Sequence, residues 1–232
     1  MNADQLLAEQ FPALCALPNV VHGFTLRVPD LEMSHDKLEA LARLDGVHRK
    51  IRSAQGLDYA PFITAQQVHG ERIGVVDRTI RGNKCFDSCD GLITNKPGVC
   101  LGIYVADCCA VYLVDPVRVA IGLVHSGKKG TELGVVAHAI QSMAEHFGSR
   151  ASDIVAQLGP CIRPPHYETD FAGKIVRQCL DLGVTALNDS GVCTACDLSR
   201  YYSYRAEKGC TGRMLAFLAL ARGEAVSKPV SG

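Results

Sequence analysis

The sequence predicts an α+β protein that forms one domain over residues 1–232, and two segments carry this prediction. The stretch from residue 91 to residue 124 is a dense series of short apolar segments, which is typical of buried strands. Residues 33–54 are charged and periodic, as expected of an amphipathic helix. No linker, internal repeat or low-complexity stretch divides the chain, so one domain is expected rather than two.

The expected elements follow in order along the chain. Residues 2–14 are expected to form a short helix or an extended lead, and residues 79–88 a polar loop that contains glycine. Strands are expected at residues 20–26, 72–76, 91–94, 99–106, 109–114, 117–124 and 152–158. Helices are expected at residues 33–54, 131–146, 171–182 and 213–222.

Residues in and next to two of these helices support the assignment. Thr131 is a residue type that often caps a helix N-terminus, and Gly148 is a residue type that often ends one. The apolar face of the first helix is expected to consist of Leu38, Leu41, Leu44 and Val47.

Composition excludes several classes of function. The 24 basic and 24 acidic side chains balance, and no run of lysine or arginine forms a stripe, so no nucleic-acid partner is expected. The apolar stretches are interrupted by Asp107 or by glycine and are too short for a membrane span. The first residues lack the basic and apolar regions of a signal peptide, so a cytoplasmic location is expected.

The chain has 11 cysteines, an odd number without a visible secretory signal, so most thiols are expected to be reduced. Cys100, Cys109 and Cys179 lie among apolar neighbours and are expected to be buried.

The motif Cys193-Thr194-Ala195-Cys196 has two interpretations. It is a redox pair, or it is half of a structural zinc site whose other half is Cys85 and Cys89.

Three soft metal ligands stand at the edges of apolar segments. They are His69, Cys108 and His125. A strand that ends in a polar ligand usually delivers it to the rim of a sheet, where loops build sites. Two imidazoles and one thiolate suit zinc, and three protein ligands leave a fourth position open for water or substrate, which is the catalytic pattern.

A series of motifs in a fixed order resembles the laccase-domain family, also described as multicopper polyphenol oxidase or purine nucleoside phosphorylase-like (the YfiH-like proteins). These motifs are His22-Gly23-Phe24-Thr25, Gln67-Val68-His69-Gly70, Asp90-Gly91-Leu92-Ile93-Thr94, Ala106-Asp107-Cys108, His125-Ser126-Gly127-Lys128-Lys129-Gly130, Leu158-Gly159-Pro160-Cys161-Ile162, His166-Tyr167-Glu168, Tyr202-Ser203-Tyr204-Arg205 and Thr211-Gly212-Arg213-Met214.

The resemblance implies a large mixed β-sheet flanked by helices, and a Zn²⁺ site at His69, Cys108 and His125. Clusters of His-Xaa-His pairs that would hold several copper ions are absent from the sequence, which favours zinc over a multicopper centre. The family block His-Ala-Gly-Trp-Arg-Gly stands here as residues 125–130 with two lysines in place of tryptophan and arginine. Lysine offers a point charge where arginine offers a planar fork for phosphate.

Further side chains are candidates for the chemistry around this site. Lys128, Lys129, Arg205 and Arg213 are candidate phosphate contacts. Asp107 is a candidate catalytic residue that orients a ligand or binds a sugar hydroxyl, and Glu168 is a candidate general acid or base. Structural alternatives remain open for these residues: a solvated turn for the lysines, fold-holding salt bridges for the arginines, and a cap or turn for Asp107.

The expected function is zinc-dependent purine nucleoside phosphorylase activity on adenosine or inosine, with adenosine deamination as an accompanying activity. The expected partners are therefore a purine nucleoside and phosphate, whereas the oligomeric state is not indicated. Two alternatives follow from the same residues. One is a hydrolase that edits wrongly built peptidoglycan precursors through a zinc-bound water, and the other is a degenerate, non-catalytic member that only binds a ligand.

Overall fold

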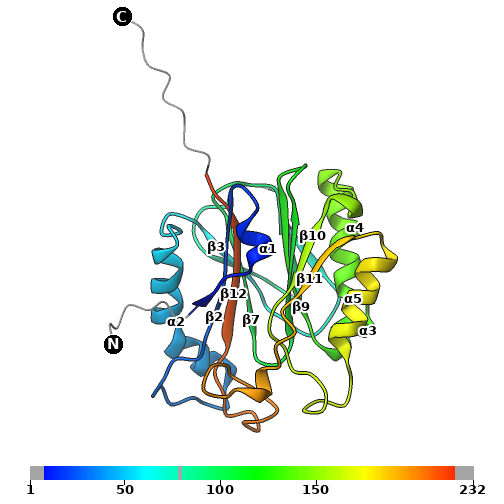
Figure 1. Cartoon of the computed structure of the whole chain (residues 1–232). Helices are drawn as coiled ribbons and strands as arrows, with labels where there is room; N and C mark the ends of the chain where they lie inside the picture. Colours follow the sequence, from blue (N-terminus) through cyan, green and yellow to red (C-terminus); the bar gives the residue numbers. More distant parts are fainter. Residues whose placement is uncertain (1–7, 78–79, 223–232) are drawn as a thin grey trace, which may run out of the picture.

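Two six-stranded mixed sheets lie face to face in the computed structural model, which describes residues 8–77 and 80–222 (Figure 1). Sheet A has the strand order β1 (Ala8–Glu9), β2 (Val20–Thr25), β12 (Met214–Leu220), β7 (Cys100–Val105), β3 (Phe62–Ala65) and β5 (Lys84–Phe86). Sheet B has the strand order β11 (Ala186–Asp189), β10 (Val155–Leu158), β8 (Cys109–Asp115), β9 (Ala120–Ser126), β6 (Gly91–Thr94) and β4 (Ile73–Val76).

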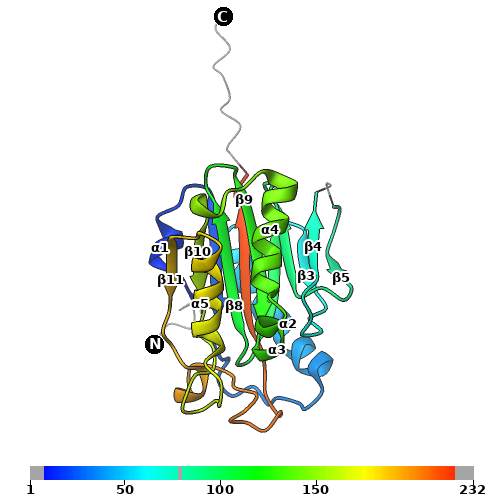
Figure 2. The same ribbon diagram turned by 90° about the vertical axis from the view of Figure 1, so that its right-hand side faces the viewer.

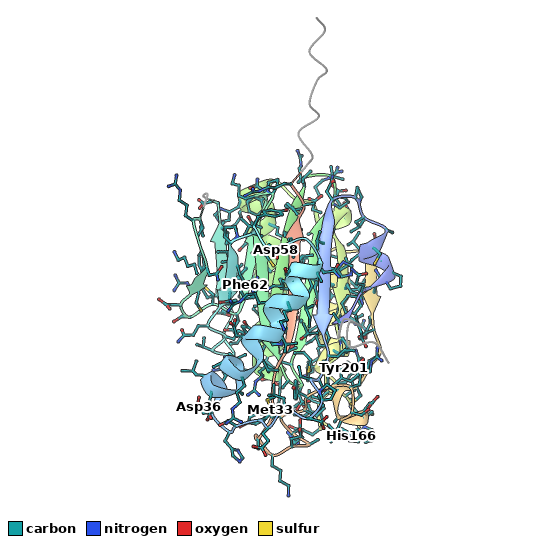
Figure 3. All side chains as sticks on the ribbon, turned by 90° about the vertical axis from the view of Figure 1, so that its left-hand side faces the viewer. Met33, Asp36, Asp58, Phe62, His166 and Tyr201 are labelled. Carbon is teal, nitrogen blue, oxygen red and sulfur yellow. The ribbon has the colours of Figure 1, made fainter. Side chains whose placement is uncertain are left out.

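Helices cover the outer faces of both sheets. Figure 3 shows α2 (Lys37–Ala54) lying across sheet A, with Asp36 at the start of the helix. Figure 2 shows α4 (Val135–Phe147) and α5 (Phe171–Asp181) in front of sheet B. The short helices α1 (Pro12–Cys15) and α3 (Lys128–Glu132) complete the fold. The α+β class and the helix-flanked mixed β architecture are confirmed, and the strands are shared between two sheets.

The central strands are apolar throughout because both of their faces are buried. Along β12, Met214, Ala216, Leu218 and Leu220 belong to the core between the sheets. Leu215, Phe217 and Ala219 belong to the core under α2. Successive side chains of a strand point to opposite faces, so a strand between two apolar layers becomes a continuous apolar run.

The predicted helix at residues 213–222 is therefore wrong, because residues 214–220 form β12 in the middle of sheet A. Seven apolar residues without a polar member carry no periodicity that separates a helix from a strand. The methionine, leucines and alanines of residues 214–220 have high helix propensity. Hydrogen bonding of this segment to β2 and β7 overrides that preference.

Three other expectations need correction. The predicted helix at 131–146 is two helices, α3 and α4, separated at Gly134, whose φ is +78°. Thr131 is not an N-cap, since its hydroxyl pairs with that of Ser126 at 2.8 Å. The predicted loop at 79–88, of which residue 79 lies outside the described residues, contains the short edge strand β5.

The predicted face of α2 is also displaced. Leu38 is 76% exposed, whereas Ala40, Leu44, His48 and Ile51 are buried. The helix begins later than predicted, where the Asp36 carboxylate accepts a hydrogen bond from the Glu39 N–H at 2.8 Å. Residues 2–7 of the predicted N-terminal element lie outside the described residues, and residues 8–15 supply β1 and α1.

The expectations for Gly148 and for three cysteines are confirmed. Gly148 ends α4 with φ of +69°, which is the left-handed conformation that glycine tolerates best. Cys100, Cys109 and Cys179 are fully buried. None of the helices in residues 8–77 and 80–222 is long and apolar enough to cross a lipid bilayer.

Replacing Gly102 of sheet A or Gly46 of α2 by alanine is expected to change the stability of the protein in opposite directions. A Cβ at Gly102 of β7 would overlap the Phe62 ring, so Gly102→Ala is expected to lower the free energy of unfolding by about 1–3 kcal/mol. Nothing lies within 4 Å of a Cβ at Gly46 inside α2, so Gly46→Ala is expected to raise it by about 0.5–1 kcal/mol. Urea denaturation of both variants measures the difference. Equal midpoints for the two variants would contradict this account of the packing.

Candidate metal centre and cavity

His69, Cys108 and His125 come together at one end of the two sheets, although they are far apart in sequence. His69 follows β3 of sheet A, Cys108 lies in the turn between β7 and β8, and His125 is near the end of β9 in sheet B. One ligand atom from each lies within 4.8 Å of the others. Of the residues that the structure describes, these three form the only such group of histidine, cysteine and acidic side chains.

The geometry of the three side chains suits a shared ion. The Cys108 Sγ is 3.9 Å from the Nε2 of His69. The rings of His69 and His125 have centroids 4.9 Å apart and meet at 73°. His69 itself has a positive φ of +60°, an uncommon conformation for a residue that is not glycine, so the loop must be held in place by its surroundings.

The Asp90 carboxylate holds that loop. It is fully buried immediately before β6, and its two oxygens accept hydrogen bonds from the backbone N–H groups of Val68 (3.1 Å), His69 (2.8 Å) and Gly70 (2.7 Å). Its Oδ1 also accepts a hydrogen bond from Nδ1 of His125 at 2.9 Å. One side chain thus positions two of the three candidate ligands.

This pairing fits metal binding. A histidine that ligates a metal usually donates its other ring N–H to a carboxylate, which fixes the ring and its tautomer. Because Nδ1 of His125 is bonded to Asp90, its Nε2 is the nitrogen directed to the shared site. Sequence reasoning missed Asp90 as a functional residue. The only signal was its place in the motif of residues 90–94.

Electrostatics favour a thiolate at Cys108. Burial raises the pKa of this thiol, but His125 and His69 more than compensate and lower it to about 6. Burial likewise lowers the pKa of His125, but the Cys108 thiolate and the hydrogen bond to Asp90 raise it to about 9. For Asp90, burial is opposed by hydrogen bonds from His125 and the 69–70 backbone, and its pKa falls to about 2. A soft anionic ligand is therefore already present at neutral pH.

Gly127 leaves the space that the sulfur occupies. A Cβ at this position would lie 2.5 Å from the Cys108 Sγ, which is closer than nonbonded atoms approach. Its φ of −100° is available to any residue, so the requirement for glycine comes from the sulfur rather than from the backbone.

The candidate ligands open into a cavity of about 690 Å³. All eight site residues predicted from the sequence line it, which are His69, Asp107, Cys108, His125, Lys128, Lys129, Arg205 and Arg213. The lining also contains aromatic and polar residues to which the sequence assigned no role, namely Lys37, Gln67, Tyr104, Tyr167, Phe171 and Tyr204. Gln67, Tyr167 and Tyr204 belong to motifs of the resemblance, whereas no motif contains Lys37, Tyr104 or Phe171.

Cationic side chains outnumber acidic ones around this cavity. Lys128 and Lys129 are exposed at the start of α3, with the Lys128 Nζ 3.8 Å from Glu168. Arg205 donates to Glu168 at 3.2 Å and lies 4.6 Å above the Tyr167 ring. Arg213 donates to the backbone carbonyls of Thr211 (2.9 Å) and Gly212 (2.8 Å) and forms no ion pair with a carboxylate of the described residues.

Glu168 is suited to balancing charge. A hydrogen bond from its own backbone, followed by the nearby Arg205 and Lys128, lowers its pKa, so the carboxylate is ionised at neutral pH. This state disfavours a role as general acid.

Asp107 holds the wall of the cavity. Its φ is +83°, and its two oxygens accept hydrogen bonds from the Thr194 hydroxyl and the Arg205 N–H, both at 2.7 Å. The side chain therefore ties two loops together beside Cys108, which matches the turn-residue alternative more closely than direct contact with a substrate.

A four-cysteine zinc site does not form. Cys85 lies on β5 of sheet A and Cys89 just before β6, while Cys193 and Cys196 belong to a 3-10 turn after β11. No group containing these cysteines gathers as metal ligands within the described part of the chain.

The comparison with known proteins agrees with this fold and shows the family of the chain. Residues 30–173 and 166–221 match the family model described as multi-copper polyphenol oxidoreductase laccase, and the chain belongs to this family. The purine nucleoside phosphorylase YlmD of Geobacillus stearothermophilus is 29% identical over 216 residues, which cover 76% of this chain and 79% of that protein. The purine nucleoside phosphorylase ORF3 of Streptomyces griseus is 30% identical over 191 residues, covering 71% and 76%.

A solved structure extends the likeness to three dimensions. The crystal structure of YlmD from Geobacillus stearothermophilus superposes with a TM-score of 0.82 at 25% identity, covering 94% of this chain and 100% of that chain.

Removing the Asp90 charge tests its control of the ligands. Asp90→Asn is expected to weaken Zn²⁺ binding by about 10–100-fold, because the loop of His69 and the ring of His125 lose their shared acceptor. Competition with a chromophoric chelator measures the affinity. Asp115→Asn is the matched control, since Asp115 is equally buried but caps the distant turn at residues 117–118. An unchanged affinity in Asp90→Asn would contradict the assigned role.

Proposed function

We propose that this protein is a purine nucleoside phosphorylase that holds one zinc ion at His69, Cys108 and His125. The observation that carries the proposal is the convergence of these three ligand atoms at the wall of a cationic cavity. The names of two related proteins, YlmD and ORF3, support the choice of reaction. The free state of all 11 cysteines accords with a reducing compartment, so we place the protein in the cytoplasm.

The donor set fits zinc. Two imidazoles and a thiolate are ligands that zinc prefers, and three of them leave one position for another group. Bound there, zinc would supply Lewis-acid polarisation of a substrate oxygen or a lowered pKa for a bound water.

The basic residues of the cavity are assigned to phosphate. Four of them line the cavity, namely Lys128, Lys129, Arg205 and Arg213. Of these four, Lys128 and Arg205 form ion pairs with the carboxylate of Glu168. A phosphate dianion held by these charges would attack the C1′ atom of the nucleoside. The bond between C1′ and the purine nitrogen breaks, the base leaves with its electron pair and takes up a proton, and the sugar becomes its 1-phosphate.

Aromatic residues are assigned to the purine. Tyr167, Phe171 and Tyr204 line the same cavity, and flat aromatic rings stack favourably on a base. The cavity of about 690 Å³ falls within the range of roughly 300–1,000 Å³ that is common for small-molecule sites. Asp107 serves as a positioning residue that keeps Arg205 at the cavity wall.

Phosphorolysis is tested directly. Zinc-loaded protein with phosphate is expected to convert inosine and adenosine to free base and ribose 1-phosphate, detected by chromatography. Cys108→Ala is expected to reduce the rate by about 100-fold or more, because the thiolate ligand is lost. Cys85→Ser removes an exposed thiol elsewhere and is the matched control.

The outcome also separates the other activities. Ammonia released from adenosine reports deamination, and release of an amino acid from a muramyl peptide precursor reports the hydrolase. Zinc-loaded protein that leaves every purine nucleoside intact would overturn the proposal.

Zinc uptake is expected to release protons in a defined pH range. Between about pH 6 and pH 9, Cys108 is a thiolate and His125 is protonated in the metal-free protein, so zinc displaces one proton from this pair. The affinity is expected to fall about tenfold per pH unit as the pH decreases across that range, and more steeply below pH 6. Calorimetry in buffers of different ionisation enthalpy counts the protons. Zero net release at pH 7.5 would contradict the thiolate–imidazolium pair.

A further inference from the structure

A pair of thiols lies directly behind the cavity wall, outside the residues that line it. Cys193 caps the start of the 3-10 turn of residues 194–196 and Cys196 is its last residue, and the Cys196 N–H donates to the Cys193 carbonyl at 3.2 Å. A turn closed by this bond brings its first and fourth Cα atoms to within about 7 Å, which overlaps the range that a disulfide spans. The two side chains are near enough to interact, because the neighbouring Cys193 thiol raises the pKa of Cys196.

The start of this turn is firmly anchored. Cys161 accepts from the Thr194 N–H and donates to the Val192 carbonyl, both at 3.2 Å. Arg163 forms an ion pair with Asp189, and its carbonyl contacts the Cys193 Sγ. Cys193 is half-buried and Cys196 is exposed, so the second sulfur is open to solutes while the first is held near it.

The turn is connected to the cavity through one side chain. Thr194, between the two cysteines, is fully buried and donates its hydroxyl to Asp107 at 2.7 Å. The other Asp107 oxygen accepts from the N–H of Arg205, a residue of the cavity wall. Thr194 and Asp107 thus link the turn by hydrogen bonds to the backbone that carries Arg205.

We infer that Cys193 and Cys196 form a redox-active dithiol whose disulfide fixes this turn and, through Thr194 and Asp107, the Arg205 segment. The oxidant is a low-molecular-weight disulfide of the glutathione class. The exposed Cys196 thiolate attacks one sulfur of the oxidant, and a thiolate leaves. The Cys193 thiolate then attacks the Cys196 sulfur and releases the second thiolate.

Atoms and electrons balance in this exchange. The cysteine pair loses two electrons and two protons, and both leaving thiolates take up a proton to become thiols. Cys109 and Cys161 lie nearby but are fully buried, so solutes reach the outer pair instead. The dithiol and its link to the Arg205 backbone do not require the proposed reaction.

Peptide mapping tests the pair without any activity assay. The full-length protein is equilibrated with oxidised glutathione, its remaining thiols are alkylated, and it is cut before aspartate residues. The peptide of residues 189–196 then contains Cys193 and Cys196 and no other cysteine. It is expected to be lighter by two hydrogens and unalkylated, and to become doubly alkylated after reduction.

Two variants make the map decisive. Cys196→Ser is expected to lose the internal disulfide and to show Cys193 only as a free thiol or a glutathione adduct. Cys85→Ser, which removes an exposed thiol of sheet A, is expected to keep it. A doubly alkylated peptide from the oxidised wild type, two glutathione adducts on it, or a link from Cys193 to Cys161 would overturn the inference.

Hydrogen exchange tests the connection to the cavity. The backbone N–H of Arg205 is expected to exchange more slowly in the oxidised form by roughly three- to tenfold, because the turn that holds Asp107 opens less often. The same amide in Cys196→Ser is expected to be insensitive to oxidised glutathione. Equal exchange of this amide in oxidised and reduced wild type would overturn the coupling, whereas failure of the nucleoside assay alone would leave both results intact.

Discussion

One buried carboxylate organises the functional end of this molecule. Asp90 lies immediately before β6 of sheet B, yet three of its hydrogen bonds come from the loop that follows β3 in sheet A. Its fourth partner is His125 on β9. A carboxylate can be fully buried only if its oxygens are satisfied, and here the groups that satisfy it are the loop and the ring that present two candidate ligands.

The sequence allowed the three candidate ligands to be predicted but not the residue that positions them. His69, Cys108 and His125 stand out because soft ligands at the ends of apolar segments are uncommon and point to a metal. Asp90 resembles any aspartate before a strand, where turns are common. Its role depends on the backbone of Gly70, twenty residues earlier, and on the ring of His125, thirty-five residues later. The residues next to Asp90 in the sequence do not indicate these partners.

The fold was predictable to the level of class and most elements, and the failures have a physical cause. Residues 214–220 are apolar at every position because a strand buried on both faces needs no polar side, and this erases the periodicity that separates strand from helix. β5 was missed because a short, exposed edge strand has little apolar content. The division of twelve strands between two sheets depends on pairings between distant segments, which composition does not encode.

The placement of the candidate ligands has a mechanical consequence for the sandwich. His69 is carried by sheet A, His125 by sheet B, and Cys108 by the turn that passes from one sheet to the other. An ion bound to all three would be a cross-link between the two layers. It would lie at the end of the sheets opposite the turn that joins β8 to β9. Its binding free energy would add to the cohesion of the layers by mass action, so that loss of the ion and separation of the sheets at this end become linked events.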